Sequence, residues 1–153
     1  MLVFGGRILA GVNRDGPHLQ TAVFCERVLQ EQDGVVSAIR MVDRIGFVTN
    51  DDGEPIQRQH PLTLLVMFKS GSARGTFTLS VRREKPSGEQ DGVLEAPVFF
   101  EGEERGVNLI LSLNFEPDQQ GLYWFDVLFE GERATRIPLR AIFQRLPTAG
   151  RGE

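Results

Sequence analysis

The side chains considered first for nucleophilic catalysis are the single cysteine, Cys25, and the two histidines, His18 and His60. Nucleophilic catalysis needs a Cys or Ser beside a base that a third group orients. Cys25 lies among apolar residues, where a thiol is more often packed and inert than reactive, and His60 precedes Pro61 in an expected loop. One cysteine and two histidines are also too few for a recognisable zinc site. We therefore expect no catalytic residue, no metal site and no cofactor.

Three other polar segments have the residue types of a ligand site but the wrong spacing. Residues 50–55 (Asn-Asp-Asp-Gly-Glu-Pro) offer carboxylates, yet an EF-hand loop alternates its ligands and ends in a distant Glu. Glu101, Glu103 and Glu104 supply neighbouring carboxylates for acid–base work, but an adjacent arginine and two glycines indicate a solvated turn. Residues 71–75 lack the Lys-Ser/Thr pair of a P-loop.

Charge and apolar-run length argue against a nucleic-acid or membrane partner. The 153 residues include 21 acidic and 17 basic side chains, whereas nucleic-acid binding usually requires a basic face. The longest apolar run, residues 62–68, is far shorter than a membrane span. The first residues lack the basic leader and cleavage site of a secretory signal, and the single cysteine cannot form an internal disulfide. We expect one domain in the cytoplasm.

The elements that would position any site are strands. The strongest strand signal is in residues 123–129. The apolar side chains of Tyr123, Phe125, Val127 and Phe129 occupy every second position there and so share one face, as a half-buried strand requires. From Val35 onward we expect seven strands, a spacing typical of an antiparallel β-sandwich: 35–48, 62–68, 76–81, 97–100, 107–115, 123–129 and 135–143.

Two of these strands carry finer expectations. The last hairpin brings Tyr123 onto the same face as Leu139 if its loop has an odd number of residues, and Glu130-Gly131-Glu132 satisfies this. In the strand 35–48, Asp43 falls at a core-facing position, where a carboxylate must find donors or shift its pKa. We expect Asp43 to lie near the sheet end, bonded to backbone or to an arginine.

The segment after Pro17 has two interpretations. Ala22, Cys25, Val28 and Leu29 fall at helical spacing, Thr21 can cap the start, and Asp33-Gly34 can end the run. We predict a short helix here. The competing interpretation makes residues 19–29 a strand and Asp33-Gly34 a hairpin turn.

The residues before Tyr123 resemble the tyrosine corner of immunoglobulin-like sandwiches, in which a Tyr hydroxyl bonds back to backbone of the preceding turn. The turn is Asp118-Gln119-Gln120-Gly121, and Phe125 stands where antibody domains have a disulfide cysteine. The resemblance implies an immunoglobulin-like sandwich. It implies no activity.

A wider pattern combines Cys25-Glu26 with Asp33-Gly34, residues 42–45 (Val-Asp-Arg-Ile) and the hairpin around Tyr123. It resembles an uncharacterised family of small bacterial β domains over residues 19–143. The resemblance implies a bacterial cytoplasmic β domain without an assigned reaction. We expect a leader or edge strand and loop over 1–17, one sandwich domain over 18–146 and a flexible tail over 147–153.

The outer face of the strand 123–129 carries the candidate binding residues, Leu122, Trp124 and Leu128. The helix predicted over residues 21–32 can cover this face; otherwise the three side chains form an exposed apolar patch, which on a domain surface marks a partner site. We expect a non-catalytic binding or accessory module that contacts another protein or itself. The alternative is a small-ligand binding domain or hydrolase with a pocket at one sandwich end.

Overall fold

The computed structural model describes residues 3–4, 7–8 and 15–147, and every regular element in these ranges is a β-strand. No helix in this part of the chain is long and apolar enough to cross a membrane. The strands are β1 (Val3–Phe4), β2 (Arg7–Ile8), β3 (His18–Gln30), β4 (Val36–Met41), β5 (Arg44–Thr49), β6 (His60–Lys69), β7 (Arg74–Glu84), β8 (Gln90–Glu101), β9 (Gly106–Phe115), β10 (Gly121–Phe129) and β11 (Glu132–Arg145).

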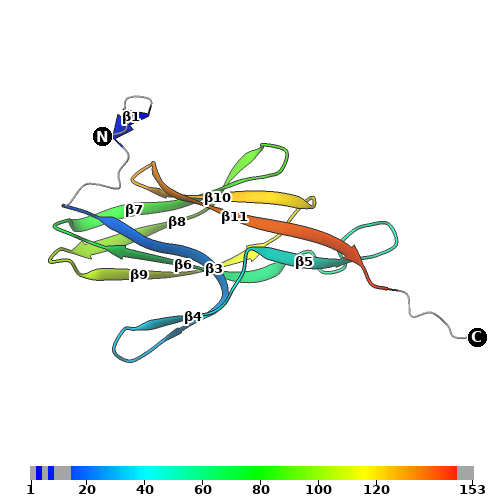
Figure 1. Cartoon of the computed structure of the whole chain (residues 1–153), viewed down its shortest axis with the longest axis horizontal. Coiled ribbons are helices and arrows are strands. Elements are labelled where there is room, and N and C mark those ends of the chain that lie inside the picture. The colour runs from blue at the N-terminus through cyan, green and yellow to red at the C-terminus, as the bar shows by residue number, and fades with distance from the viewer. Residues whose placement is uncertain (1–2, 5–6, 9–14, 148–153) are drawn as a thin grey trace, which may run out of the picture.

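Two sheets pack face to face (Figure 1), with strand orders β5-β11-β10-β7-β8 and β4-β3-β6-β9, while β1 and β2 form a separate ribbon. The all-β sandwich expected from the alternating pattern is confirmed. All strand pairs are antiparallel except β5 with β11. Residues 1–2, 5–6, 9–14 and 148–153 lie outside the described residues, so the expected leader and loop are described only at residues 3–4, 7–8 and 15–17, and the tail only at Pro147.

The prediction of a helix over residues 21–32 is wrong. The structure contains the hairpin of the competing interpretation instead. Ala22 and Phe24 pair with Val66 and Leu64 on β6, so alternate residues of β3 pack into the core. Sheet pairing and core packing override a weak helical spacing in a segment rich in strand formers. The turn forms at Gly34, which has a φ of 85° that favours glycine.

The expected strand 35–48 is split into β4 and β5, which gives eight strands from Val35 onward instead of seven. Val42 N donates to Phe24 O (2.9 Å) on β3, whereas Arg140 N on β11 donates to Asp43 O (2.9 Å). The two neighbouring residues are therefore bonded to different sheets. The alternation of inward-facing and outward-facing side chains does not continue across such a change of sheet. Asp43 is exposed, so the core-facing position expected for it is wrong. Its carboxylate lies 3.0 Å from Arg44, and the hydrogen bond from Arg44 lowers the pKa of Asp43, as expected for an Asp bonded to an arginine.

The β3–β4 hairpin folds back over the outer face of the four-stranded sheet (Figure 1). At its tip, Gly34 O accepts a hydrogen bond from Asn108 Nδ2 on β9 (3.4 Å). Cys25 and Leu65 point to this outer face, because they alternate with core residues, yet both are buried. The hairpin thus covers a second apolar cluster outside the main core.

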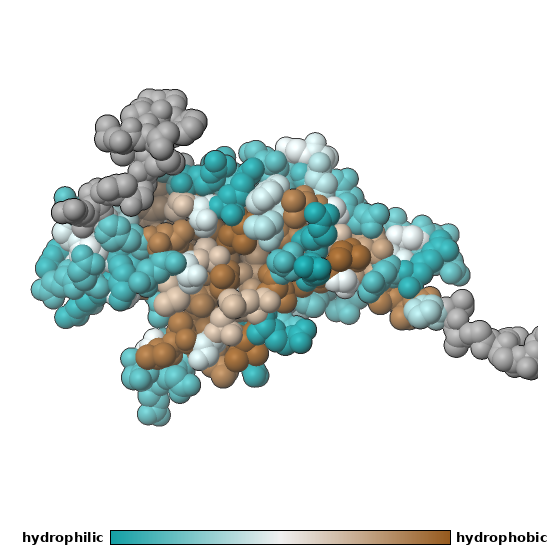
Figure 2. All heavy atoms as spheres, in the orientation of Figure 1, coloured by the Kyte–Doolittle hydropathy of each residue, from teal (hydrophilic) through white to brown (hydrophobic). Residues whose placement is uncertain are grey.

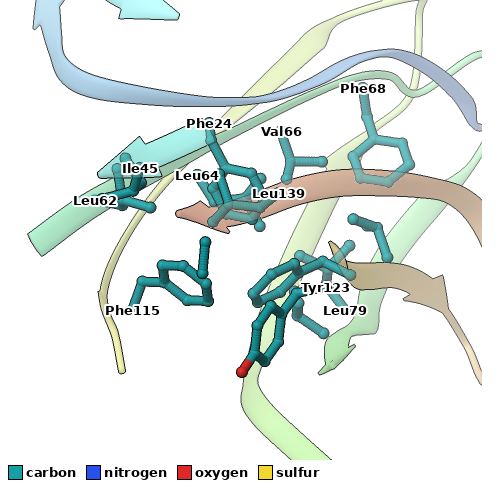
Figure 3. Packing of buried hydrophobic residues seen from close by; sticks show 14 of the residues in the cluster. Phe24, Ile45, Leu62, Leu64, Val66, Phe68, Leu79, Phe115, Tyr123 and Leu139 are labelled. Atoms are coloured by element: carbon teal, nitrogen blue, oxygen red, sulfur yellow. The ribbon is translucent and has the colours of Figure 1, made fainter. Parts of the chain in front are cut away.

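The main core lies between the sheets (Figure 3) and is rich in aromatic rings. Phe24 of one sheet meets Phe125 of the other edge to face, with centroids 4.9 Å apart, and Phe115 meets Tyr123 in the same way at 5.2 Å. Edge-to-face pairs stabilise a core by about 0.5–1.5 kcal/mol beyond their buried area. These contacts fix how the two sheets face each other.

Tyr123 is fully buried, and its hydroxyl returns to the preceding turn. The hydroxyl oxygen lies 2.8 Å from Gln119 O and 2.8 Å from Asp118 Oδ1, and it accepts from Gln119 N (3.2 Å). The bond to backbone expected from the tyrosine-corner resemblance is present. Burial, followed by the bond to Asp118, raises the pKa of Tyr123 to about 12.

The last hairpin has the predicted facing pairs but a shorter loop. Tyr123 pairs with Leu139 and Val127 with Thr135, as the parity argument requires. A register shift follows Val127, so that Phe129 pairs with Glu132 and only Glu130-Gly131 remain in the turn. A β-bulge absorbs the extra residue that the sequence assigned to the loop.

We expect Tyr123 to ionise with a pKa of about 12 in the folded protein, against 10.0 for an ordinary tyrosine. Between these values the folded state keeps a proton that the unfolded state has lost. The stability from this group is therefore complete below pH 10 and is lost as pH rises through about 12. Tyrosinate absorbance measures this directly, because Tyr123 is the only tyrosine; a native midpoint equal to that in denaturant would contradict the buried hydroxyl.

We expect the thiol of Cys25 to react slowly with a chromogenic disulfide, because burial removes access and raises its pKa. Reaction then requires the β3–β4 hairpin to open. Asn108→Ala removes the bond at the hairpin tip and should speed labelling about two- to fivefold, the effect of one hydrogen bond. Asn114→Ala, on the same strand, is the control. Equal labelling rates for the two variants would show that access to the Cys25 thiol does not depend on opening of the hairpin.

Candidate functional site

The three residues predicted to bind lie on β10, on the outer face of the five-stranded sheet. They do not form an open apolar patch, because Leu128 is buried and Leu122 and Trp124 are half-buried. The predicted helix does not cover them, since the segment 21–32 belongs to the other sheet. Their role in binding stays a prediction.

An arginine from β11 covers the indole of Trp124. The guanidinium carbon of Arg136 lies 5.4 Å from the Trp124 ring centroid, within range for a cation–π interaction. Arg136 Nε donates to Asp126 Oδ1 (2.7 Å) and its Nη2 donates to Glu84 Oε2 (2.7 Å). The two carboxylates raise the pKa of Arg136, so the tryptophan lies under a permanent, anchored positive charge.

A hollow lies on the side of the sandwich where β3 and β11 face each other. β4 bonds to β3 only from Cys25 onward, and β5 bonds to β11 only from Arg140 onward. In the described part of the chain, residues 18–23 and 132–139 therefore each leave one backbone edge unpaired. We call the hollow between them the β3–β11 groove.

The β3–β11 groove has a volume of about 840 Å³. Its floor includes the rings of Phe68 and Phe129, which are tilted by 46° to each other with centroids 5.6 Å apart. Figure 2 looks onto this side and shows hydrophobic atoms gathered between hydrophilic rims. Its lining consists of Pro17, His18, Leu19, Gln20, Thr21, Ala22, Phe68, Phe129, Glu132, Arg133, Ala134 and Thr135.

The two free edges give the groove the dimensions of an extended peptide. Six to eight residues at about 3.3 Å per residue span roughly 20–26 Å. Each free edge presents backbone N–H and C=O groups that a further strand can bond. The groove therefore combines main-chain partners along its sides with an apolar floor.

A second hollow, of about 460 Å³, lies at the sandwich end near the turn before Tyr123. Two of its charged groups form ion pairs: Lys85 with Asp118 (3.1 Å), and Arg83 with Asp91 (2.5 Å), which lies outside its lining. The hydrogen bond from Tyr123, followed by that from Lys85, holds the pKa of Asp118 below its usual value, and Asp118 in turn raises the pKa of Lys85. Both groups are fixed in their ordinary charged forms.

The residues first considered for catalysis are far apart. His18 and Cys25 lie seven positions apart on the same strand, which separates their Cα atoms by roughly 23 Å. His60 begins β6 and its ring packs against Phe47 at 6.4 Å. Within the described ranges, no group of three or more His, Cys, Asp or Glu side chains could hold a metal ion.

Sequence reasoning missed the β3–β11 groove. The groove depends on where β4 and β5 stop pairing, which is a property of the sheets and not of any local pattern. Pro138 was the one local signal: it lacks an N–H and lies on β11, and proline favours an edge position.

No protein-family model matches the sequence, and no curated protein matches it significantly. Among solved structures, a β-glucosidase from Listeria innocua is similar, with a TM-score of 0.51 at 10% identity over 82% of this chain and 17% of that one. The CARDB domain of the PF1109 protein from Pyrococcus furiosus, solved with di-metal ions, gives 0.47 at 12% identity over 85% and 97%. The alkylpurine DNA glycosylase AlkC from Pseudomonas fluorescens gives 0.46 at 13% over 87% and 32%. The likeness is one of fold alone.

We expect Arg136→Ala to lower the free energy of unfolding by about 1 to 2 kcal/mol, because it leaves two carboxylates without their charged donor. The side chain of Asp126 is only 15% exposed. The matched control is Arg133→Ala, 56% exposed and 3.7 Å from the same carboxylate, which should cost less than about 0.5 kcal/mol. Denaturant unfolding followed by Trp124 emission measures both, and equal effects would contradict the anchoring role of Arg136.

Proposed function

We propose that this domain is a non-catalytic binding module that receives an extended segment of a partner protein in the β3–β11 groove. One observation carries the proposal: the unpaired edges of β3 and β11 lie on either side of a groove with an apolar floor. Strand addition to a free sheet edge gives affinity through main-chain hydrogen bonds, and pockets for alternate side chains give specificity. The proposal includes an immunoglobulin-like arrangement of the strands, which holds the edges of β3 and β11 on either side of the groove.

The rim of the groove favours a peptide over a highly charged ligand. Glu132 and Arg133 contribute one charge of each sign, and the other lining residues include no Asp, Glu, Lys or Arg. A segment with alternating apolar and polar residues matches this arrangement, since every second side chain would face the ring pair of Phe68 and Phe129.

The hollow at the sandwich end is the place where the alternative function, small-ligand binding or hydrolysis, would be located. General acid–base catalysis works best with a pKa near the operating pH. The hydrogen bond from Tyr123, followed by that from Lys85, moves the pKa of Asp118 down, and the hydrogen bond to Asp118 moves the pKa of Lys85 up, away from neutrality in both cases. This favours binding over proton transfer as the function of the domain.

A phage-displayed library of random linear peptides, selected on the folded protein, tests the proposal. We expect selected peptides with alternating apolar residues, whose binding shifts amide NMR signals of residues 18–23 and 132–139. Ala134→Arg places a charge on an exposed groove position and should weaken binding about tenfold or more, the loss expected for an interface core residue. Thr76→Arg, exposed on the outer face of β7, is the control.

Two outcomes would overturn the groove as the site. Signals shifting around Arg58, Arg83 and Lys85 would move binding to the sandwich end and favour the alternative function. Loss of binding with Trp124→Ala, but not with Ala134→Arg, would place it on the outer face that the sequence predicted.

A further inference from the structure

Outside the β3–β11 groove, the sheet edges formed by the described strands are guarded, with one exception. Unpaired edges recruit other strands, and proteins protect them with charges, proline, bulges or short length. Among the described strands, β4 and β5 are only six residues long and each has an arginine, Arg40 and Arg44. β8 has a bulge in its pairing with β7, and four guarding residues: Asp91, Glu95, Pro97 and Glu101.

The exception is β9, the outer strand of the four-stranded sheet. Its ten residues, Gly-Val-Asn-Leu-Ile-Leu-Ser-Leu-Asn-Phe, include no charge and no proline. It pairs with β6 in one unbroken register from Gly106↔Lys69 to Phe115↔His60. In the described part of the chain, its other edge bonds to no strand.

We propose that β9 pairs antiparallel with β9 of a second copy of this chain, joining the two four-stranded sheets across a two-fold axis. The axis must stand perpendicular to the sheet, because only then do both cores stay on the same side. Residues that face each other then have the same parity, so the axis passes through Ile110 or Leu111.

The side chains of β9 suit this self-pairing on both faces. The inner row (Val107, Leu109, Leu111 and Leu113) is only partly buried at the rim of the core, and a partner strand would cover its open flank with the same apolar residues. The outer row has three polar residues and one apolar residue, none of them charged: Asn108, Ile110, Ser112 and Asn114.

The order of residues along β9 favours a second copy over a foreign strand. With the axis at Ile110, the inner row pairs Leu109 with Leu111 and Val107 with Leu113, so apolar side chains meet apolar ones. In the outer row Asn108 lies opposite Ser112, so polar side chains meet polar ones and no charge is brought opposite a like charge. β9 also lies on the opposite side of the sandwich from the β3–β11 groove (Figure 1), so pairing leaves the groove open.

The size of the contact predicts a weak dimer. Ten residues from each copy fall below the 20–30 residues a side of a standard interface, and such contacts are typically transient. The association should therefore be seen over a range of protein concentrations, with dissociation in the micromolar range or weaker.

Sedimentation velocity on the full chain, over a concentration series, tests the proposal. We expect the mass to rise from 17.1 kDa toward twice that value. Ile110→Lys, at a position 39% exposed on the outer row, should weaken the dimer about tenfold or more, because two like charges meet near the axis. The matched control is Phe99→Lys, 59% exposed on the other edge strand, β8, which should leave the dimer intact.

Mixing the Ile110→Lys and Ile110→Glu variants adds a second readout, because opposite charges near the axis should restore a dimer that neither variant forms alone. Circular dichroism confirms that each variant is folded. A wild-type chain that stays monomeric at all concentrations would overturn the proposal. So would a dimer that survives Ile110→Lys or is lost with Phe99→Lys.

Discussion

The change of sheet between Val42 and Asp43 determines how the rest of this sandwich is arranged. Two adjacent residues are held by backbone hydrogen bonds to strands of opposite sheets, Val42 to β3 and Asp43 to β11. The crossing chain closes one end of the β3–β11 side and leaves the other open, since β4 and β5 pair only beyond it. The groove is thus a direct result of where the chain changes sheets. Because both bonds involve main-chain groups, substitutions at these positions can preserve the crossing.

The two outer faces of the sandwich are covered by different physical means. On the four-stranded sheet, the β3–β4 hairpin folds over Cys25 and Leu65 and covers an apolar cluster with backbone and side chains. On the five-stranded sheet, a cation lies over an aromatic ring: Arg136 is held above Trp124 by two carboxylates. The first cover can open as a unit, as hairpins with few long-range contacts do. The second depends on the ion pairs that Arg136 makes with Asp126 and Glu84.

The sequence predicted those features that depend on alternation within one strand. The core face of β10, the pairing of Tyr123 with Leu139 and the antiparallel sandwich all follow from period-two patterns. It failed where non-local pairing decides the outcome. Helical spacing in residues 21–32 was misleading because β6 offers β3 a ladder that no local pattern records. The split at Val42 and the one-residue shift after Val127 were missed for the same reason: in each case, a strand changes partner or register without any break in its apolar pattern. The candidate residues Leu122, Trp124 and Leu128 were placed on the correct face, but the arginine above them could not be deduced from spacing within their own strand.

The positions of the groove and of β9 on opposite sides have a consequence for how a dimer would bind. Pairing through β9 gives the strand order β3-β6-β9-β9-β6-β3 across both copies. The bound segments lie beyond the free edges of the two β3 strands, so seven strand spacings of about 4.8 Å separate them by roughly 34 Å. A partner with two binding segments needs a flexible linker of roughly 40 residues to match that span. With such a linker, the second segment binds as an intramolecular event at a high effective concentration, so weak individual contacts can still give a tight complex. A dimer too weak to persist alone would be stabilised by the same partner, because a bivalent segment binds only the paired state at both grooves.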